Sequence, residues 1–368
     1  MNCLMSASVC FVACHGGPAD HFAVFAEHLI QKGYQVEVYA SGPATEKLSS
    51  RGIKAIAFDT TEPEAAETLA KKCAQFSVVI TDVGHQFDLD LQQALKQHAL
   101  KTVRLAYYDN PESFVPGGYS SLAEKVMLAA DQALFANARL VQEIKIELPV
   151  ERRIGLGYYP VEQPERIASK RASDHALSRC KFFSDHAAQD RGQKLFVYAG
   201  GNNSEYFDKA LPAFLEMLSQ ACQKEDLSKL VIVLQQHPGA KGLNLDKKQI
   251  EQWMLEHSSS EKSPQWVIST WNSNDIQIAA DCMLYYQTSM GPQFVLAGLP
   301  VIQVGHHVYE DVLVRNQLCA TAINPHQLLT HIQAFEQKQP SDHALIMQGL
   351  GILPDWRDHL EKALRIPS

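Results

Sequence analysis

The chain has 368 residues, of which 46% are hydrophobic, and a formal net charge of −8 at pH 7. This length is large for one ordinary domain but allows two, each with its own hydrophobic core. The negative charge and the absence of any basic run argue against a nucleic-acid-binding protein.

No apolar run approaches the roughly 20 residues that a bilayer-spanning helix needs, so we expect no transmembrane segment. The first basic residue is Lys32, whereas a secretory signal peptide begins with a basic region. The eight cysteines form no C-x-x-C pair, and several lie in apolar runs typical of buried strands. Because free thiols persist in a reducing compartment, we expect a cytoplasmic protein.

The first half of the chain alternates apolar runs of strand length with amphipathic stretches of helix length. A strand at residues 9–13 precedes Gly16-Gly17 and a helix that starts near Ala19 and ends at Gly33. Further strands are predicted at residues 36–40, 53–58, 78–81, 103–107 and 133–136. Further helices are predicted at residues 64–76, 89–98 and 122–130. This alternation is typical of a parallel sheet covered by helices on both faces.

The pattern weakens at residues 151–193 and then resumes, so we interpret that stretch as a linker with one helix near residues 165–183. Later strands are predicted at residues 195–199, 230–235, 266–269, 282–286 and 301–304, and the last helices at 325–337 and 355–364. The predicted fold is α/β, with two doubly wound Rossmann-like domains facing each other across a cleft. Their predicted bounds are 1–150 and 194–345, and a C-terminal helix in 346–368 is expected to pack back on the N-terminal domain.

A strand, a Gly-Gly turn and a helix occur in this order twice, at Gly16-Gly17 and again at Gly200-Gly201. Glycines after a parallel strand let a ligand approach backbone N–H groups closely, and the helix start adds positive charge. Both turns are therefore candidate sites for an anionic ligand.

A second candidate anion site lies in residues 275–302, which are predicted to run helix, strand, polar turn, helix and strand. Thr288 and Ser289 stand where a helix N-cap belongs, ahead of Gly291 and Pro292. Hydroxyls and free N–H groups there would suit a diphosphate. The alternative is a plain strand-to-helix connection with a good cap.

These motifs resemble those of the two-domain GT-B glycosyltransferases. The most similar branch contains the peptidoglycan N-acetylglucosaminyltransferase and the non-hydrolysing UDP-N-acetylglucosamine 2-epimerase. The resemblance rests on GGPADH at residues 16–21, YAGGNNS at 198–204 and QFVLAGLP at 293–300. It implies that a nucleotide-sugar donor, with a UDP-sugar favoured, is bound without a metal. It also implies donor contacts from Gly17, Gly200, Gly201, Asn202, Asn203 and Ser204.

The chain departs from the resembling proteins near Gln293. The transferases usually have at this position a glutamate that binds the ribose hydroxyls, and Gln293 carries no charge. The epimerases have a Ser-Gly-Gly turn followed by paired glutamates, and the segment from Ser289 to Phe294 lacks both carboxylates. This difference makes an epimerase less favoured than a transferase.

A transferase that inverts its sugar needs a base near neutral pH, and histidine suits that role. His21, close to the first glycine turn, is the first candidate, and His15 is its rival. Asp82 and Asp109 each follow a predicted strand, at the sheet edge where open α/β folds bind ligands. Either aspartate could act as the base or orient it. Turn or capping roles are the alternative.

Two histidine loops in the second domain complete the predicted site. His237 directly precedes Pro238. In several GT-B branches, including bacterial sialyltransferases, a His-Pro pair at this place assists the departing phosphate. The resemblance therefore keeps a CMP-sugar as an alternative donor. The resemblance also implies that His306, Tyr309 and Glu310 lie over the donor sugar. Adjacent histidines rarely share one metal ion, and no nearby carboxylate has a suitable spacing, so no metal site is predicted.

The sequence thus predicts a glycosyltransferase that moves a sugar from a nucleotide-sugar to an unidentified acceptor, which is a glycan, a lipid or a small molecule. One alternative is a sugar-nucleotide epimerase or hydrolase of the same fold. Another is a catalytically inactive protein that binds sugar nucleotides.

Overall fold

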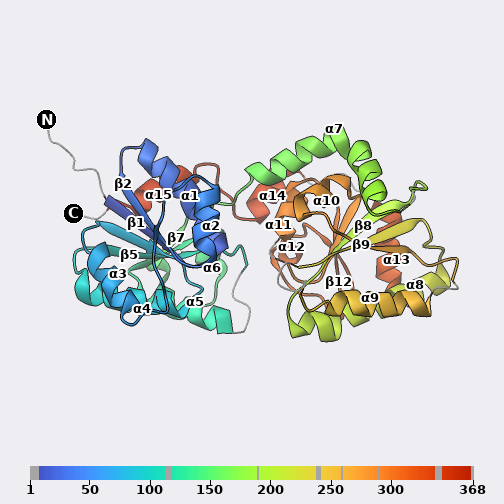
Figure 1. The fold of residues 1–368 in the computed structure, drawn as a ribbon, viewed down its shortest axis with the longest axis horizontal. Helices are drawn as coiled ribbons and strands as arrows, with labels where there is room; N and C mark the ends of the chain where they lie inside the picture. Colours follow the sequence, from blue (N-terminus) through green and yellow to red (C-terminus); the bar gives the residue numbers. More distant parts are fainter. Residues whose placement is uncertain are drawn as a thin grey trace. The chain divides into compact units, whose positions relative to one another are not determined.

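The computed structural model describes residues 8–112, 118–188, 190–237, 242–257, 260–288, 290–335 and 342–365. The chain divides into two compact units (Figure 1). Unit 1 comprises Met1–Tyr159 together with Gly351–Ser368, and unit 2 comprises Pro160–Leu350. The predicted boundaries at 150 and 345 therefore move to 159 and 350. The chain passes from one unit to the other twice.

Unit 1 contains a seven-stranded parallel sheet, whose central strands are apolar and buried as the sequence predicts. In sheet order its strands are β3 (Ile56–Ala57), β2 (Gln35–Ala40), β1 (Ser8–Ala13), β4 (Val78–Thr81), β5 (Val103–Tyr108), β6 (Gln132–Phe135) and β7 (Arg153–Gly155). In register, Val9 of β1 lies opposite Val36 of β2 and Val78 of β4.

Helices cover both faces of this sheet (Figure 1). One face carries α1 (Gly16–Gln31), α2 (Pro43–Ser50) and α15 (Trp356–Ala363). The other face carries α3 (Ala65–Cys73), α4 (Gln86–His98), α5 (Gly118–Ala129) and α6 (Leu140–Glu143). A short 3₁₀ turn, Val150–Arg152, precedes β7.

The C-terminal helix α15 is part of the core of unit 1. The Trp356 ring lies 5.4 Å from that of Phe25 in α1 and 4.7 Å from that of Tyr158. His28 Nε2 lies 3.0 Å from Glu361 Oε1 at the edge of this contact. Residues distant in sequence thus close the hydrophobic core on the α1 face of the sheet.

Unit 2 contains a six-stranded parallel sheet. In sheet order its strands are β10 (Gln265–Ile268), β9 (Leu230–Gln235), β8 (Lys194–Ala199), β11 (Cys282–Tyr285), β12 (Val301–Val304) and β13 (Ala320–Ala322). Its helices are α7 (Glu162–Asp185), α8 (Leu211–Lys224), α9 (Leu245–Glu256), α10 (Ser273–Ala279), α11 (Gly291–Leu296), α12 (Val312–Arg315), α13 (Pro325–Ala334) and α14 (His343–Gly349). A single π-helical turn, Tyr206–Ala210, leads into α8.

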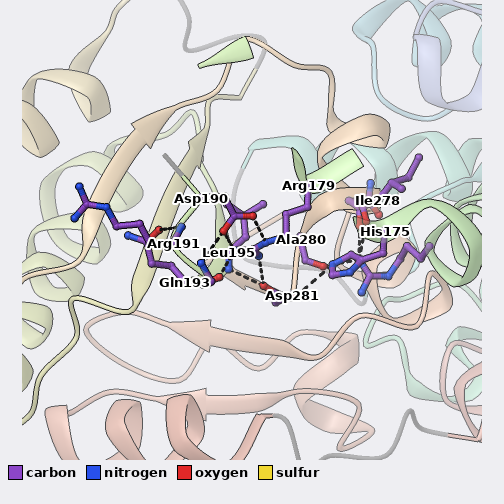
Figure 2. A network of polar contacts seen from close by, with 12 residues as sticks. His175, Arg179, Asp190, Arg191, Gln193, Leu195, Ile278, Ala280 and Asp281 are labelled. Carbon is purple, nitrogen blue, oxygen red and sulfur yellow. Dashed lines mark hydrogen bonds and ion pairs between the residues drawn. The ribbon is translucent and has the colours of Figure 1, made fainter. Parts of the chain in front are cut away.

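The stretch interpreted as a linker is structured. Residues 153–155 form β7 at the edge of the first sheet, and residues 162–185 form the 24-residue helix α7 of unit 2. A polar network fastens α7 to the amino edge of the second sheet (Figure 2). In it Asp281 Oδ2 accepts hydrogen bonds from Arg179 at 2.8 Å and from the Leu195 amide at 2.7 Å.

Helix α7 is the longest helix in the described part of the chain, and charged residues occur along its whole length. No helix among the described residues combines the length and the apolar character needed to cross a bilayer.

Candidate functional site

The candidate residues gather at the carboxyl edge of each sheet, where the strands of an open α/β sheet end together. In unit 1, the loops after β1, β4 and β5 bring together four ionisable side chains, which we call the acidic cluster. Its members are His15, Asp82, Asp88 and Asp109.

Asp82 lies at the centre of the acidic cluster, directly after β4, and is 0% exposed. Its Oδ2 accepts hydrogen bonds from the backbone amides of Cys14 at 2.9 Å and His15 at 3.1 Å. The same oxygen lies 3.3 Å from Nδ1 of the His15 ring. Asp82 therefore connects β4 to the turn that precedes α1.

Asp88 lies behind Asp82, in the first turn of α4. Its Oδ2 accepts a hydrogen bond from the His85 amide at 2.7 Å, while the His85 ring accepts one from the Phe87 amide, which together form a capping box. Burial and the Asp82 charge raise the pKa of Asp88 well above its usual range. Burial opposes the ionisation of Asp82, but hydrogen bonds with Asp88, His15 and the Cys14 amide hold its pKa below its usual value.

The opposite pKa shifts of Asp82 and Asp88 are those expected of two carboxyl groups that share one proton. Oδ1 of Asp82 and Oδ1 of Asp88 have no hydrogen-bond partner among the described residues. A neutral Asp88 that donates to an ionised Asp82 accounts for both oxygens and for the opposite directions of the two pKa shifts.

Asp109 follows β5 and is partly exposed. Its carboxyl group lies against the first turn of α1, where a Cβ built on Gly17 would come within 2.6 Å of Asp109 Oδ2. Burial, and next the Asp82 charge, raise the pKa of Asp109 to about 7. Gly17, predicted to contact the donor, thus makes room for this carboxyl group.

His15 is the exposed member of the acidic cluster, with 42% of its side chain accessible. Its hydrogen bond to Asp82 raises the pKa of its ring. A partly exposed histidine with one ring nitrogen in contact with a carboxylate is well placed to exchange protons.

The position of His21 contradicts its predicted role as the general base. Helix α1 begins at Gly16, three residues before the predicted start, so His21 falls in its second turn and faces the sheet. Its side chain is 7% exposed, with Nδ1 2.7 Å from the Tyr107 hydroxyl and the ring 4.9 Å from that of Tyr158. Burial lowers its pKa to about 4. A neutral histidine enclosed by aromatic rings cannot reach an acceptor hydroxyl.

In unit 2, the glycine turn after β8 is shaped by Tyr206. A Cβ on Gly201 would lie 2.6 Å from the Tyr206 ring, so the backbone passes directly over this side chain. Asn203 Oδ1 accepts from the Tyr206 amide at 2.8 Å, and its Nδ2 donates to Gln287 Oε1 at 3.1 Å. The loops after β8 and β11 therefore meet through Asn203, beside exposed Asn202 and Ser204.

The turn after β11 differs in detail from the prediction. Thr288 Oγ1 accepts from the Met290 amide at 3.2 Å, so it closes the turn ahead of α11 and does not cap that helix. Gly291 opens α11, and Gln293 lies half-buried in its first turn. Ser289 lies outside the described residues.

The loop after β12 is held from below by Gln303, which is buried. Its amide donates to the Tyr309 carbonyl at 2.7 Å and accepts from the Tyr309 amide at 2.8 Å. Glu310 is exposed, and His306 contacts Glu205 of the loop after β8. His237 is half-buried at the end of β9, where burial lowers its pKa.

The structure thus gathers Gly17, Asp82 and Asp109 around His15 in unit 1, and the predicted donor loops at the edge of unit 2. It adds residues that the sequence analysis missed. For Asp88 a signal was present, because an acidic residue three positions after an N-cap is typical of a capping box. For Glu205 the sequence held no such signal.

The whole chain is similar to solved structures at low sequence identity. A glycosyltransferase from Rickettsia africae ESF-5 has a TM-score of 0.69 at 12% identity, over 99% of this chain and 100% of that one. UDP-GlcNAc 2-epimerase from Neisseria meningitidis, bound to UDP-GlcNAc, has a TM-score of 0.64 at 10% identity, over 97% and 99%. An Anabaena protein in complex with UDP has a TM-score of 0.60 at 10% identity, over 97% and 99%.

These similarities confirm the predicted fold: the chain has the GT-B architecture of two Rossmann-like domains. Neither a protein-family model nor a curated protein sequence matches it.

Proposed function

We propose that the chain is a glycosyltransferase that transfers a sugar from a nucleotide-sugar, with a UDP-sugar favoured, to an acceptor hydroxyl. The observation that carries the proposal is the acidic cluster, which places a carboxyl group with a pKa of about 7 at the sheet edge where α/β folds bind ligands. The similar proteins named above include a glycosyltransferase and a UDP-GlcNAc-bound epimerase, which supports a sugar nucleotide as ligand.

In the proposed reaction Asp109 is the general base. Its carboxylate takes the proton from the acceptor hydroxyl while the acceptor oxygen attacks the anomeric carbon and the bond to the nucleotide phosphate breaks. A base with a pKa near the working pH is best matched to this step. Asp109 is partly exposed, so it then releases the proton to solvent, and the His15 ring, held by Asp82, favours the ionised form of Asp109 through its positive charge.

We assign donor binding to the edge of unit 2. The Gly200 amide donates to the Gln235 carbonyl at 3.0 Å, so we place the departing diphosphate against the loop from Gly201 to Ser204, which Asn203 fixes through Tyr206 and Gln287. Preorganised N–H donors of this kind stabilise charge that develops on a leaving group.

The first test is a thermal-shift panel of UDP-, GDP-, CMP- and dTDP-sugars. A ligand at 100 times its Kd adds about 2.7 kcal/mol of stability, enough to raise Tm by several degrees. Asn203→Ala should reduce that shift for the donor that binds, whereas Gln220→Ala, at an exposed position on α8 outside the predicted site, serves as the control.

The second test follows the donor that the panel identifies. A transferase releases the nucleotide faster when acceptors are added, while an epimerase converts the donor alone. A panel with no responding nucleotide-sugar, or a donor that is only epimerised, would refute the proposal.

A further inference from the structure

The loops after β8 and β12 bring two histidines and one carboxylate together. His306 Nε2 lies 2.9 Å from Glu205 Oε1 and 2.8 Å from His307 Nδ1. All three donor atoms lie within 4.8 Å of one another. We propose that Glu205, His306 and His307 bind a divalent transition-metal ion of the zinc class. This inference does not depend on the proposed transferase activity.

Hydrogen bonds alone do not account for this group of side chains. His306 Nε2 carries at most one hydrogen, yet it lies at hydrogen-bond distance from two different atoms. Nδ1 of His306 is also buried and has no hydrogen-bond partner among the described residues. A cation at the meeting point binds a lone pair from each of the three side chains at once.

Neighbouring residues hold the two rings in place. The Tyr286 hydroxyl lies 3.3 Å from His307 Nε2, so a ring that ligates through Nδ1 can donate its other N–H to that oxygen. Such outer hydrogen bonds orient histidine ligands in metal sites. Tyr286 in turn packs directly on the loop, since a Cβ on Gly305 would lie 2.4 Å from its ring.

Lys209 is the cation nearest to the cluster. Its Nζ lies 3.1 Å from Glu205 Oε2, which leaves Oε1 directed at His306. The Lys209 side chain is 59% exposed, so solvent weakens its repulsion of a metal ion, but at 3.1 Å from Glu205 the repulsion is not removed. Its removal should therefore strengthen metal binding, a result that a purely structural salt bridge would not produce.

The donor set selects the class of metal. Two imidazole nitrogens and one carboxylate oxygen form a set that Zn²⁺ uses in proteins, whereas Mg²⁺ and Ca²⁺ prefer oxygen donors alone. Three protein ligands leave the fourth tetrahedral position to water or to an anionic oxygen. His307 is exposed, so an ion can enter from solvent. The sequence argument against a metal rested on the adjacency of the two histidines and on the lack of a carboxylate. In the structure the two adjacent rings converge, with Nε2 of His306 2.8 Å from Nδ1 of His307, and Glu205 supplies the carboxylate.

The test is titration of the metal-free, full-length protein with Zn²⁺ by calorimetry and with Co²⁺ by visible absorption. We expect one ion per chain in the wild type. Glu205→Gln and His306→Ala should each weaken binding by more than about tenfold, because even outer contacts of metal ligands are worth that much. His326→Ala removes an exposed histidine elsewhere and should change nothing. Lys209→Ala should bind more tightly.

Three results would overturn the inference. The wild type could fail to bind either ion at excess metal, or binding could survive in Glu205→Gln and His306→Ala. Binding could also be lost in Asp88→Asn instead, since Cys14, Asp82 and Asp88 are likewise within 4.8 Å of one another. Circular dichroism checks folding. If His306→Ala does not fold, the near-isosteric Glu205→Gln gives the answer alone.

Discussion

Carboxylates of low exposure occur in both units, and Asp281 of unit 2 differs from the acidic cluster of unit 1 in how well cations match its charge. Asp281, at the amino edge of the second sheet, contacts Arg179 at 2.8 Å and His175 at 3.4 Å. Burial opposes its ionisation, yet contacts with His175, the Leu195 amide and Arg179 hold the pKa of Asp281 below its usual value. This arrangement is typical of a group that fastens structure.

The acidic cluster of unit 1 has the opposite balance. Asp82, Asp88 and Asp109 crowd together with His15 as the one partly charged partner we identify among the described residues. Burial and mutual repulsion raise the pKa values of Asp88 and Asp109. Carboxyl groups whose ionisation is disfavoured in this way are candidates for a functional site. The comparison teaches that the partners of a buried carboxylate, more than its burial, indicate its role.

The largest expected effect is that of Asp109→Asn on activity. The amide cannot accept a proton, so turnover of the donor identified by the thermal-shift panel should fall by about 10²–10⁴-fold. Stability at pH 8 should rise, because the neutral amide removes a buried charge. Steady-state kinetics and thermal unfolding measure the two quantities. Wild-type turnover, or a clear loss of stability, would place Asp109 with the structural carboxylates.

The pH dependence of turnover tests the same difference between Asp109 and a structural carboxylate such as Asp281. Asp109 must be ionised to act as a base, so turnover should rise as pH increases through about 7, its pKa. Since folding raises this pKa, the folded state binds the proton more strongly, and its stability falls as pH rises toward 7. Asp109→Asn should abolish both trends. A rate that is level between pH 6 and 8 would exclude Asp109 as the base.

Asp281→Ala should act on stability. Removal of the carboxylate takes one of two carboxylate partners from Arg179, which keeps Asp190, and leaves the Leu195 amide without its acceptor, so unit 2 should be destabilised by about 1–3 kcal/mol. Thermal unfolding should show a Tm lower by several degrees. Asp174→Ala, at an exposed position on the same helix, is the matched control and should stay within about 0.5 kcal/mol of wild type.

Gly17→Ala should give a smaller effect on activity than Asp109→Asn. The added methyl group would meet Asp109 Oδ2 at 2.6 Å and push the carboxyl group aside, which should slow turnover by about tenfold or more. Stability should not fall, because alanine favours a helix over glycine by about 1 kcal/mol. Gly16→Ala is the control, since nothing lies within 4 Å of its Cβ position. Equal kinetics for both variants would contradict this role of Gly17.

His21→Gln should have the smallest effect. Turnover should change little, while the weakened contact with Tyr107 should reduce the free energy of unfolding by about 1 kcal/mol. The low pKa of His21 also predicts that its contribution to stability is present above pH 6.5 and is lost as pH falls toward 4. A large loss of activity in a folded variant would restore His21 as a catalytic candidate.

Much of the fold could be predicted from the sequence because its central strands are apolar runs between turns. The predicted strand at residues 78–81 coincides with β4, and that at 301–304 with β12. The edge strands β7 and β13 were missed because each has only three residues. Helix α7 was only partly identified because its exposed surface is polar and few of its side chains are buried.

Only those site residues whose location follows from the order of the strands could be predicted from the sequence. Asp82 and Asp109 follow strands of a parallel sheet, so their placement at one edge follows from topology. The burial of His21 was not foreseen because the start of α1 lies three residues earlier than expected, which turns its side chain toward the core. The pairing of Glu205 with His306 depends on contact between two loops, and no local pattern encodes it.

The return of residues 351–368 to unit 1 has a consequence for synthesis of the protein. Trp356 and Leu360 belong to the same buried core as Phe25. Unit 1 therefore begins to leave the ribosome before unit 2, but its core is completed after that of unit 2. Unit 2 can close its own core while the nascent chain is still growing, but the packing around α1 must wait for the final helix.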